Sequence, residues 1–433
     1  MVKDWLLPPK GSRDFPPEIQ ILRKEVFERI ERIFQKYGFD PIETPIVEKW
    51  ETLAGKYGEE AENRLIWRFK LPYSNREFGL RYDLTVPLAR FVARFRPKLP
   101  FKRYHIGRVF RYDEPQKGRY REFWQCDVDI VGSNSPLADA EILDIVIDVF
   151  EEFGFKNFVI KLNDRRILRG LFEKELELKN KQILFKIYRI IDKLDKIGKE
   201  KVLKEIREII GNRKSEKIGE LLEKNKLDNE EILEYLESVG NKNVEEGVSS
   251  ISKILEFSKA KEKIKIDLSL VRGLDYYTGM IYEAIVEEPK IGSLSGGGRY
   301  DNLIELFARE KIPAVGGSIG VERLIDAGLE LGLLKAEKKT YAKIGIIYTK
   351  EIDQKFVKKI ADELRNLGIN TYLSFNGIRN IADGIKDLEK RGIRYALIVG
   401  KREVENKYFT FQDLEERRRS EIESLEEVKK LIS

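Results

Sequence analysis

Residues 107–129, GRVFRYDEPQKGRYREFWQCDVD, combine two strand-like segments with a basic polar loop. Side chains alternate well enough in residues 104–111 and 122–131 to predict two antiparallel strands, and residues 113–121 form the loop between them. Arg111 ends the first strand, and the loop adds a lysine and two arginines. Guanidinium groups pair phosphate oxygens bidentately, so this concentration favours an anion site, although a solvated hairpin with surface charges has the same composition.

The return strand of this hairpin carries polar side chains on one face. Because side chains alternate along a strand, every second residue from 123 to 129 points to the same face. Those residues are Phe123, Gln125, Asp127 and Asp129. An apolar sheet does not place so many hydrogen-bond acceptors side by side without a ligand for them. The hairpin therefore predicts a binding site on this face.

Around the hairpin, the hydrophobic periodicity predicts a mixed antiparallel α+β core. The predicted helices cover residues 16–37, 84–95 and 136–153, and two more begin near Asp301 and Val321. The other predicted strands cover residues 39–47, where prolines interrupt the strand, and 65–71, 77–81, 266–270 and 280–286. A glycine cluster follows at 295–298.

Residues 165–262 differ from that core, because they contain no proline and are rich in Lys, Glu, Ile and Leu. We expect several helices that break at Gly198, Gly211 and Gly240. Residues 165–265 hold 25 Lys or Arg against 20 Asp or Glu, so their net charge of +5 makes up most of the chain's +6. This excess fits either a solvated helical surface or a surface that contacts nucleic acid.

A short charged linker at residues 335–341 leads to a C-terminal region in which strand and helix patterns alternate. Strands are predicted at 343–348, 370–373 and 395–399, and helices at 352–367 and 378–391. This alternation predicts a small α/β domain with a mixed sheet.

The composition excludes several kinds of site. Cys126 is the only cysteine and His105 the only histidine, which excludes an intramolecular disulfide, a cysteine metal site and a histidine-cluster zinc site. The sequence shows no signal peptide and no apolar run of membrane-spanning length, so we expect a cytoplasmic protein without a membrane partner. Charged residues make up 36%, against about 25% in typical domains. That excess fits adaptation to heat, although an AT-rich genome also enriches Lys and Ile.

The quoted hairpin resembles motif 2 of the class II aminoacyl-tRNA synthetases, and its QKGRYR loop resembles that of the histidyl family. Other segments resemble the same family, in the same order along the chain. They are PIETPIVE at 41–48 (motif 1, a dimer element), RYDLT at 81–85, LVRGLDYYT at 270–278, SGGGRYD at 295–301 and GGSIGVER at 316–323 (motif 3). Each is weak alone, but together they span nearly the whole chain, which is identified as a member of the histidyl-tRNA synthetase family.

The resemblance implies a class II catalytic domain over residues 1–330, an antiparallel sheet flanked by helices, with a helical insertion domain at 165–262 that contacts the acceptor arm. A linker at 331–341 would lead to an α/β anticodon-binding domain at 342–433. It further implies a homodimer that uses ATP, L-histidine and tRNA(His) and forms histidyl-adenylate with release of pyrophosphate. Mg²⁺ would bridge the β- and γ-phosphates of ATP mostly through water, with no metal site built by the protein.

For ATP, the resemblance carries specific roles onto residues of this chain. Arg111 and Arg272 would be catalytic, one on each side of the α-phosphate, where negative charge builds. The other matching ATP contacts are Asp113 at the adenine edge, Arg119 and Arg323 at the outer phosphates and adenosine, and Phe123 stacked on adenine.

The histidine pocket needs acceptors for the ammonium group and partners for the imidazole ring. Positions that match the family's ammonium contacts are Asp83, Thr85 and Gln125, and those that match its imidazole contacts are Asp129 and Tyr277. The pocket would be completed by Arg272, Tyr276 and Arg299. Asp129 stands where bacterial relatives usually carry the longer Glu, and core packing is the alternative role for Tyr277. His105, on a predicted strand, is expected to be structural.

Three other classes of protein share parts of this pattern. The histidine-binding regulatory paralogue of ATP phosphoribosyltransferase usually lacks the C-terminal domain and loses the Arg111 and Arg272 positions, which this chain keeps. Synthetase-like RNA-binding modules are normally fused to other domains and lose phosphate-binding arginines. Threonyl and prolyl synthetases lack the VRGLDYY segment at 271–277, and the threonyl enzyme needs His and Cys metal ligands that this composition does not supply.

Overall fold

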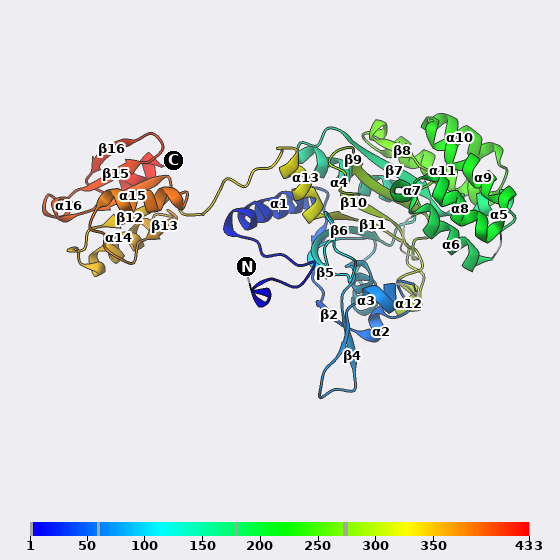
Figure 1. Cartoon of the computed structure of the whole chain (residues 1–433), viewed down its shortest axis with the longest axis horizontal. Helices are drawn as coiled ribbons and strands as arrows, with labels where there is room; N and C mark the ends of the chain where they lie inside the picture. The colour runs from blue at the N-terminus through cyan, green and yellow to red at the C-terminus, as the bar shows by residue number, and fades with distance from the viewer. Residues whose placement is uncertain (1–2, 59–60, 179, 272–275, 433) are drawn as a thin grey trace. The chain divides into compact units, whose positions relative to one another are not determined.

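The computed structural model describes residues 3–58, 61–178, 180–271 and 276–432 (Figure 1). The chain divides into two compact units: Met1–Asp14 with Val26–Leu334, and Phe15–Glu25 with Lys335–Ser433. The predicted helix at 16–37 is confirmed as α1 (Pro17–Lys36), which contributes to both units. Within the described ranges, no helix is both long enough and apolar enough to span a membrane.

An eight-stranded mixed sheet forms the centre of the first unit. Its strand order is β1-β5-β6-β11-β10-β9-β7-β8, and neighbours are antiparallel except β1 with β5 and β7 with β8. The strands are β1 (Asp40–Pro41), β5 (Phe101–Phe110), β6 (Glu122–Val131), β7 (Phe158–Asp164), β8 (Ile264–Ile266), β9 (Met280–Val286), β10 (Ser295–Arg299) and β11 (Ala314–Gly320). The predicted antiparallel hairpin is confirmed as β5 and β6.

Helix α4 (Pro136–Glu152), predicted at 136–153, packs on one face of this sheet. A Cβ atom on Gly317 of β11 would lie 3.2 Å from Ile142 of α4, and Gly317 pairs with Val128 of β6. Val128 therefore faces α4, and its neighbours Asp127 and Asp129 face the opposite side of the sheet. That opposite side holds the polar residues that the hairpin pattern singled out.

A second, three-stranded sheet of the first unit has the order β2-β4-β3. Its strands are β2 (Val47–Lys49), β3 (Arg68–Lys70) and β4 (Glu77–Leu80), and helices α2 (Trp50–Leu53) and α3 (Thr85–Phe95) accompany it. The strand predicted at 39–47, with prolines interrupting it, divides into β1 and β2, which belong to different sheets. Pro41 and Pro45 lack the amide donors that one continuous strand would need. The predicted strand at 65–71 shortens to β3, since Ala61–Leu65 form a π-helical turn.

Helices α5 to α11 follow one another between residues 165 and 257 and pack mainly on each other (Figure 1). They are α5 (Arg165–Glu175), α6 (Lys181–Ile191), α7 (Leu194–Ile197), α8 (Lys199–Ile210), α9 (Asn212–Glu223), α10 (Asn229–Ser238) and α11 (Lys242–Phe257). The predicted breaks are confirmed. Gly198 and Gly211 have φ of +80° and +82°, a left-handed conformation that costs glycine little and ends each helix.

Three expectations for the last part of the first unit change. The strand predicted at 266–270 lies earlier, as β8, because the Asp267 carboxylate accepts the Ser269 amide and turns the chain. The glycine cluster forms strand β10. A Cβ atom on Gly297 would lie 2.1 Å from the Gly316 oxygen, so glycine is needed for β10 and β11 to pair. The helix expected near Asp301 begins later, as α12 (Glu305–Ala308), while the one near Val321 is α13 (Val321–Glu330).

The second unit contains a five-stranded sheet in the order β13-β12-β14-β15-β16, parallel among β13, β12 and β14 and antiparallel beyond. Its strands are β12 (Ile344–Tyr348), β13 (Thr371–Leu373), β14 (Tyr395–Val399), β15 (Phe409–Asp413) and β16 (Arg418–Ile422), and its helices are α14 (Gln354–Asn366), α15 (Ile381–Lys390), α16 (Lys401–Glu405) and α17 (Leu425–Leu431). The mixed sheet is confirmed. The elements after residue 400 were not predicted, because their short strands and charged helices lack a clear period.

Candidate active site

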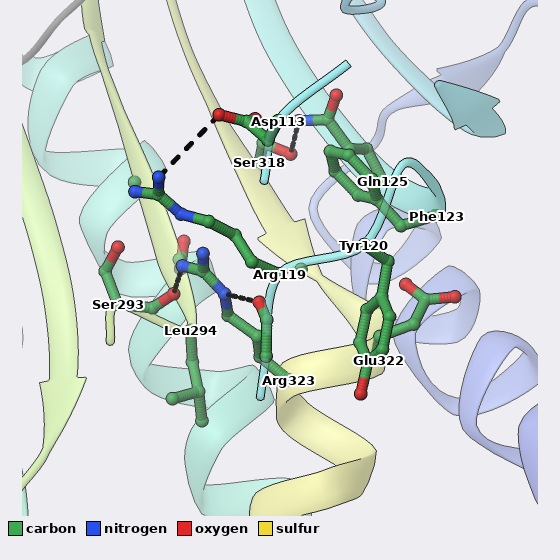
Figure 2. Close-up of a pocket in the computed structure, with 14 residues that line it drawn as sticks. Asp113, Arg119, Tyr120, Phe123, Gln125, Ser293, Leu294, Ser318, Glu322 and Arg323 are labelled. Carbon is green, nitrogen blue, oxygen red and sulfur yellow. Dashed lines mark hydrogen bonds and ion pairs between the residues drawn. The ribbon is translucent and has the colours of Figure 1, made fainter. Parts of the chain in front are cut away.

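Two adjoining pockets open on the side of the central sheet away from α4. The larger pocket, of about 650 Å³, lies between the 113–121 loop, β10, β11 and the start of α13 (Figure 2). The smaller pocket, of about 390 Å³, lies over β6, β10 and β11. Gln125, Gly296 and Ser318 line both pockets. A ligand with two parts could therefore occupy both at once.

The floor of the smaller pocket is backbone rather than side chain. Gly316 and Ser318 of β11 pair with Asp129 and Asp127 of β6, and Gly296 of β10 pairs with Ser318. A Cβ atom on Gly316 would lie 1.9 Å from Asp129 Oδ1. These small residues leave the space that a ligand needs beside the polar face of β6.

The larger pocket gathers the four residues predicted for it from sequence: Asp113, Arg119, Phe123 and Arg323. Figure 2 shows the Arg119 guanidinium turned toward the Asp113 carboxylate, 3.7 Å away. Arg323 donates from Nε to the Gly118 oxygen and from Nη1 to the Ser293 oxygen, both at 2.6 Å. Two fixed cations and an aromatic ring in one pocket suit a ligand that carries both phosphate and an aromatic base.

The N-terminal segment holds the 113–121 loop in place, a role that the sequence analysis missed. Arg13 stacks 3.7 Å above the Tyr120 ring and pairs with Asp326 at 3.4 Å, while the Tyr120 hydroxyl donates to Asp326 at 2.7 Å. Lys10 pairs with Glu114 at 2.5 Å. Burial, followed by the hydrogen bond to Asp326, raises the pKa of Tyr120 to about 12, so the hydroxyl keeps its proton.

The smaller pocket brings together the remaining predicted residues that the structure describes, except Arg299. They are Asp83, Thr85, Arg111, Gln125, Asp129, Tyr276 and Tyr277. Arg111 donates from Nε to the Tyr82 oxygen at 3.0 Å, and its guanidinium lies 5.2 Å from the Phe123 ring of the larger pocket. Arg111 therefore stands where the two pockets meet. Arg272, the second predicted catalytic arginine, lies outside the described residues.

Asp83 is buried and already surrounded by donors. Its carboxylate accepts hydrogen bonds from the Tyr57 hydroxyl at 2.9 Å, the Tyr276 hydroxyl at 3.1 Å and the backbone amides of Thr85 and Val86. Burial raises the pKa of Asp83 above its ordinary value, and these hydrogen bonds oppose that rise. Tyr57 was not predicted, because no pattern in its own segment links it to residue 83.

Asp129 is held from behind by two residues that the sequence analysis did not single out. Its Oδ1 accepts a hydrogen bond from the Tyr300 hydroxyl, and its Oδ2 lies 2.6 Å from Arg103 Nη2 in an ion pair. Arg103 is fully buried and sits opposite Asp129 in the register of β5 and β6. The pairing of the two predicted strands could have indicated this contact, because oppositely charged residues directly opposite each other on neighbouring strands attract.

Gln125 and Asp127 complete the polar face of β6. Gln125 donates from Nε2 to the Ser318 hydroxyl at 2.6 Å, and that hydroxyl is hydrogen-bonded to the Asp127 carboxylate. Gln125 Oε1 and Asp127 Oδ1 are buried with no hydrogen-bond partner among the described residues. Burial raises the pKa of Asp127 to about 7; nearby Arg103 lowers it and Asp129 raises it further.

Two further residues lie apart from the ligand positions. Arg299 pairs with Asp139 at 2.6 Å and lines neither pocket, although it was expected to shape the histidine pocket. His105 is buried, and burial together with Arg103 and Arg81 lowers its pKa to about 3, so the ring is neutral. Across the described ranges, no three His, Cys, Asp or Glu side chains converge in a way that could hold a metal ion.

Comparison with known proteins gives concordant matches. Residues 11–324 match the family model described as histidyl-tRNA synthetase, and residues 343–433 match one described as anticodon binding domain. The chain is 51% identical to a histidine–tRNA ligase of Nanoarchaeum equitans over 431 residues, 99% of this chain and 100% of the relative. It is 48% identical to one of Aeropyrum pernix, over 93% and 92%. A crystal structure of histidyl-tRNA synthetase from Nostoc sp. PCC 7120 is similar with a TM-score of 0.80, at 30% identity over 100% of both chains.

Proposed function

The chain belongs to the histidyl-tRNA synthetase family. On that premise we propose which substrate each of its two pockets binds and how their residues promote the reaction. The chain is an ATP-dependent histidine–tRNA ligase: it joins L-histidine to AMP with release of pyrophosphate and then transfers histidine to the 3′ end of tRNA(His). The observation that carries this proposal is the position of Arg111, which lines the smaller pocket and lies 5.2 Å from the Phe123 ring of the larger pocket.

The chemistry of activation explains why a cation belongs at that junction. The histidine carboxylate attacks the α-phosphorus of ATP, a new C–O–P bond forms, and the bond to pyrophosphate breaks. Negative charge builds on the α-phosphate oxygens, and a fixed guanidinium stabilises that charge without rearrangement. Arg111 would supply one such group, and Arg272, by its match to the family, would supply a second. The carboxylate is already ionised, so no protein base is required.

In the larger pocket, ATP would lie between the 113–121 loop and α13. Phe123 would stack on the adenine opposite Arg323, and Asp113 would accept from the exocyclic amine at the adenine edge. Arg119 and Arg323 would bind the outer phosphates and adenosine. Their present partners are one carboxylate at 3.7 Å and backbone oxygens, which phosphate oxygens can replace.

In the smaller pocket, the histidine ammonium group would lie near Asp83, Thr85 and Gln125, beside Arg111. The imidazole ring would lie deeper, toward Asp129 and Tyr277. Tyr276 would act through Asp83, because its hydroxyl donates to that carboxylate at 3.1 Å. An amino acid in this orientation would point its carboxylate toward the larger pocket, where the α-phosphate would lie.

Mg²⁺ would enter with ATP. Glu322 lines the larger pocket and offers carboxylate oxygens, the ligands that Mg²⁺ prefers. When bound, the ion would neutralise charge on the β- and γ-phosphates.

The remaining parts of the chain would serve the RNA and the assembly. We propose that residues 1–330 form the catalytic domain, that helices within residues 165–262 contact the acceptor arm of tRNA(His), and that residues 342–433, after the linker 331–341, read the anticodon. The segment around Pro45 would contribute to a homodimer, and the protein would act in the cytoplasm.

A regulatory histidine-binding paralogue is the main alternative, and the site argues against it. A protein that only binds histidine has no use for phosphate-binding cations. Here Arg111, Arg119 and Arg323 all lie at the two pockets, and residues 343–433 match an anticodon binding domain.

ATP–pyrophosphate exchange measured with each of the twenty amino acids tests the proposal. Exchange that depends on L-histidine alone is the expected result. The absence of exchange with histidine, from protein whose thermal unfolding is cooperative, would instead favour the regulatory paralogue.

A further inference from the structure

Two consecutive backbone oxygens after β8 are held by side chains from the end of β7 and the start of α5. Asn163 donates from Nδ2 to the Leu270 oxygen at 3.0 Å, and Arg165 donates from Nη1 to the Val271 oxygen at 3.0 Å. Asn163, Leu270 and Val271 are buried, so solvent competes little for these hydrogen bonds. Together the two donors fix the position and the orientation of the backbone at residues 270–271.

Arg165 also binds the chain on the far side of the two tyrosines of the smaller pocket. Its backbone amide donates to the Gly279 oxygen at 3.0 Å, where it continues the β7–β9 ladder by one hydrogen bond. Tyr276 and Tyr277 line the smaller pocket and lie in the sequence between Val271 and Gly279. A single residue outside this stretch therefore fastens it at both ends.

The two tyrosines make close contacts that require an accurate backbone position. The Tyr276 hydroxyl donates to the Asp83 carboxylate at 3.1 Å. The Tyr277 ring packs against β10 so tightly that a Cβ atom on Gly298 would lie 2.8 Å from its Cδ1. A displacement of the chain at either attachment point would move both side chains relative to these partners, and so change the pocket that they line.

The guanidinium of Arg165 is itself positioned by helix α6. It lies 5.4 Å from the centre of the Tyr188 ring, and that ring lies 5.4 Å from the Phe172 ring of α5. Burial raises the pKa of Tyr188 to about 12, although the nearby Arg165 opposes this rise, so the phenol is uncharged and attracts the guanidinium through its ring face. Arg165 thus joins the helices after β7 to the stretch that carries the pocket tyrosines.

We propose that Arg165 is a positioning residue for histidine binding: its guanidinium fixes the backbone at Val271, Tyr188 holds that guanidinium in place, and Tyr276 and Tyr277 depend on both. This inference rests on the proposed function, since it takes histidine as the ligand of the smaller pocket. Arg165 binds the ends of the stretch and acts on the substrate only through the two tyrosines. Such indirect contacts matter because a misplacement of about 1 Å in a substrate site can cost about 10²-fold in rate.

The test compares Arg165→Met with the matched variant Arg166→Met, using ATP–pyrophosphate exchange and thermal unfolding. Methionine keeps an unbranched side chain but removes the donor to Val271, and the backbone bond to Gly279 remains. Arg166 is the next residue of α5, and its guanidinium donates to the Asp164 carboxylate at 2.9 and 2.7 Å. Arg166→Met should lower the melting temperature at least as much, because Asp164 is fully buried and loses a cationic partner.

The two variants should differ in their kinetics. Arg165→Met should raise KM for histidine about 5- to 20-fold and leave KM for ATP within about 2-fold. Arg166→Met should leave both KM values within about 2-fold despite its lower melting temperature. Arg165→Lys, which keeps a cationic donor, should bring KM for histidine back to within about 3-fold of wild type.

Several results would overturn the assignment. An unchanged KM for histidine in Arg165→Met would remove Arg165 from any role at the pocket. Equal rises in Arg165→Met and Arg166→Met, or equal rises for histidine and ATP, would show general destabilisation at the start of α5. If Arg165→Met does not fold, Tyr188→Leu is the second variant, and an unchanged KM for histidine there would also count against the proposal. Wild-type protein without histidine-dependent exchange would sink the proposed function itself, a different outcome from an active wild type with an unaffected Arg165 variant.

Discussion

At the scale of single residues, the pockets differ in whether their charged groups are already paired. Asp83 accepts four hydrogen bonds from the protein. Asp127 Oδ1, Gln125 Oε1 and Asp129 Oδ2 have no hydrogen-bond partner among the described residues, although Asp129 Oδ2 forms an ion pair with Arg103. Arg111 donates from only one nitrogen, Nε, in the hydrogen bonds that the structure defines for it. Buried polar groups without hydrogen-bond partners lower the stability of the ligand-free protein. They also favour ligand binding, because a bound ligand supplies the missing partners.

The two arginines proposed at the α-phosphate should act in the transition state more than in substrate binding. Arg272→Ala should leave histidine binding nearly intact and slow activation about 10²- to 10³-fold, equivalent to about 2.7–4 kcal/mol. Calorimetric titration with histidine and single-turnover adenylate formation measure the two effects separately. A fall of affinity and rate by the same factor would instead make Arg272 a ground-state or structural residue.

The buried carboxylate of Asp127 should make the stability of the protein depend on pH. Its pKa is about 7 in the folded protein and near 3.9 in an unfolded chain. Between these values the folded state binds more protons than the unfolded state, so stability falls as pH rises from about 4 to about 7. Asp127→Asn removes this charge and should raise the melting temperature above that of wild type at about pH 8.

The same comparison at lower pH provides its control. The advantage of Asp127→Asn should shrink as the pH is lowered to about 4, where the wild-type carboxyl is protonated in the folded state. Thermal unfolding of ligand-free protein, followed by circular dichroism at three pH values, measures the gap. A gap of constant size would show that Asn stabilises through packing and that Asp127 does not titrate in this range.

At the scale of elements, the 113–121 loop depends on the N-terminal segment for its position. Arg13 joins the loop to α13 through Tyr120 and Asp326, and Lys10 joins it through Glu114. Because the loop carries Arg119, these contacts should affect ATP rather than histidine. Arg13→Ala should raise KM for ATP about 3- to 10-fold and leave KM for histidine nearly unchanged, as expected for the loss of one cation–π contact and one partly exposed ion pair.

Arg29→Ala is the matched control for that variant. Arg29 also stacks on a ring, Phe153, at 4.3 Å and also forms an ion pair, with Glu152 at 2.8 Å, but both of these partners lie outside the 113–121 loop. It should change thermal stability by a similar amount without changing either KM. If the two variants altered KM for ATP equally, the N-terminal segment would have no special role at the loop.

At the scale of the whole molecule, the two compact units should separate amino-acid activation from anticodon recognition. All the residues assigned to ATP and histidine lie in the first unit, and none lies beyond residue 334. Deleting residues 342–433 should therefore preserve ATP–pyrophosphate exchange while raising the tRNA concentration needed for charging by orders of magnitude. Light scattering must accompany the assay, because loss of the proposed homodimer would lower charging for a different reason. Full charging by a dimeric truncated protein would exclude an anticodon role for this region.

Much of the fold was accessible from the sequence because its signals are local. The alternation in residues 104–111 and 122–131, the helical period of 136–153 and the glycines that end α7 and α8 all act through neighbours in the chain. The motif order also indicated the family. The glycine cluster at 295–298 was not predicted as a strand, because glycine has a low strand preference. It forms β10 because β11 lies too close for a side chain at Gly297.

The sequence by itself determined which polar residues share the exposed face of β6, since strand geometry places every second side chain on the same side. It could not determine which of them remains available to a ligand. That depends on Tyr57, Arg103, Tyr300 and Ser318, which come from distant parts of the chain and meet the acids only after the sheet has formed. Hydrogen bonds act over about 3 Å and do not depend on the distance along the chain. Only the tertiary structure therefore decided that Asp83 accepts four hydrogen bonds, that Asp129 pairs with Arg103 and that Asp127 Oδ1 has no partner among the described residues.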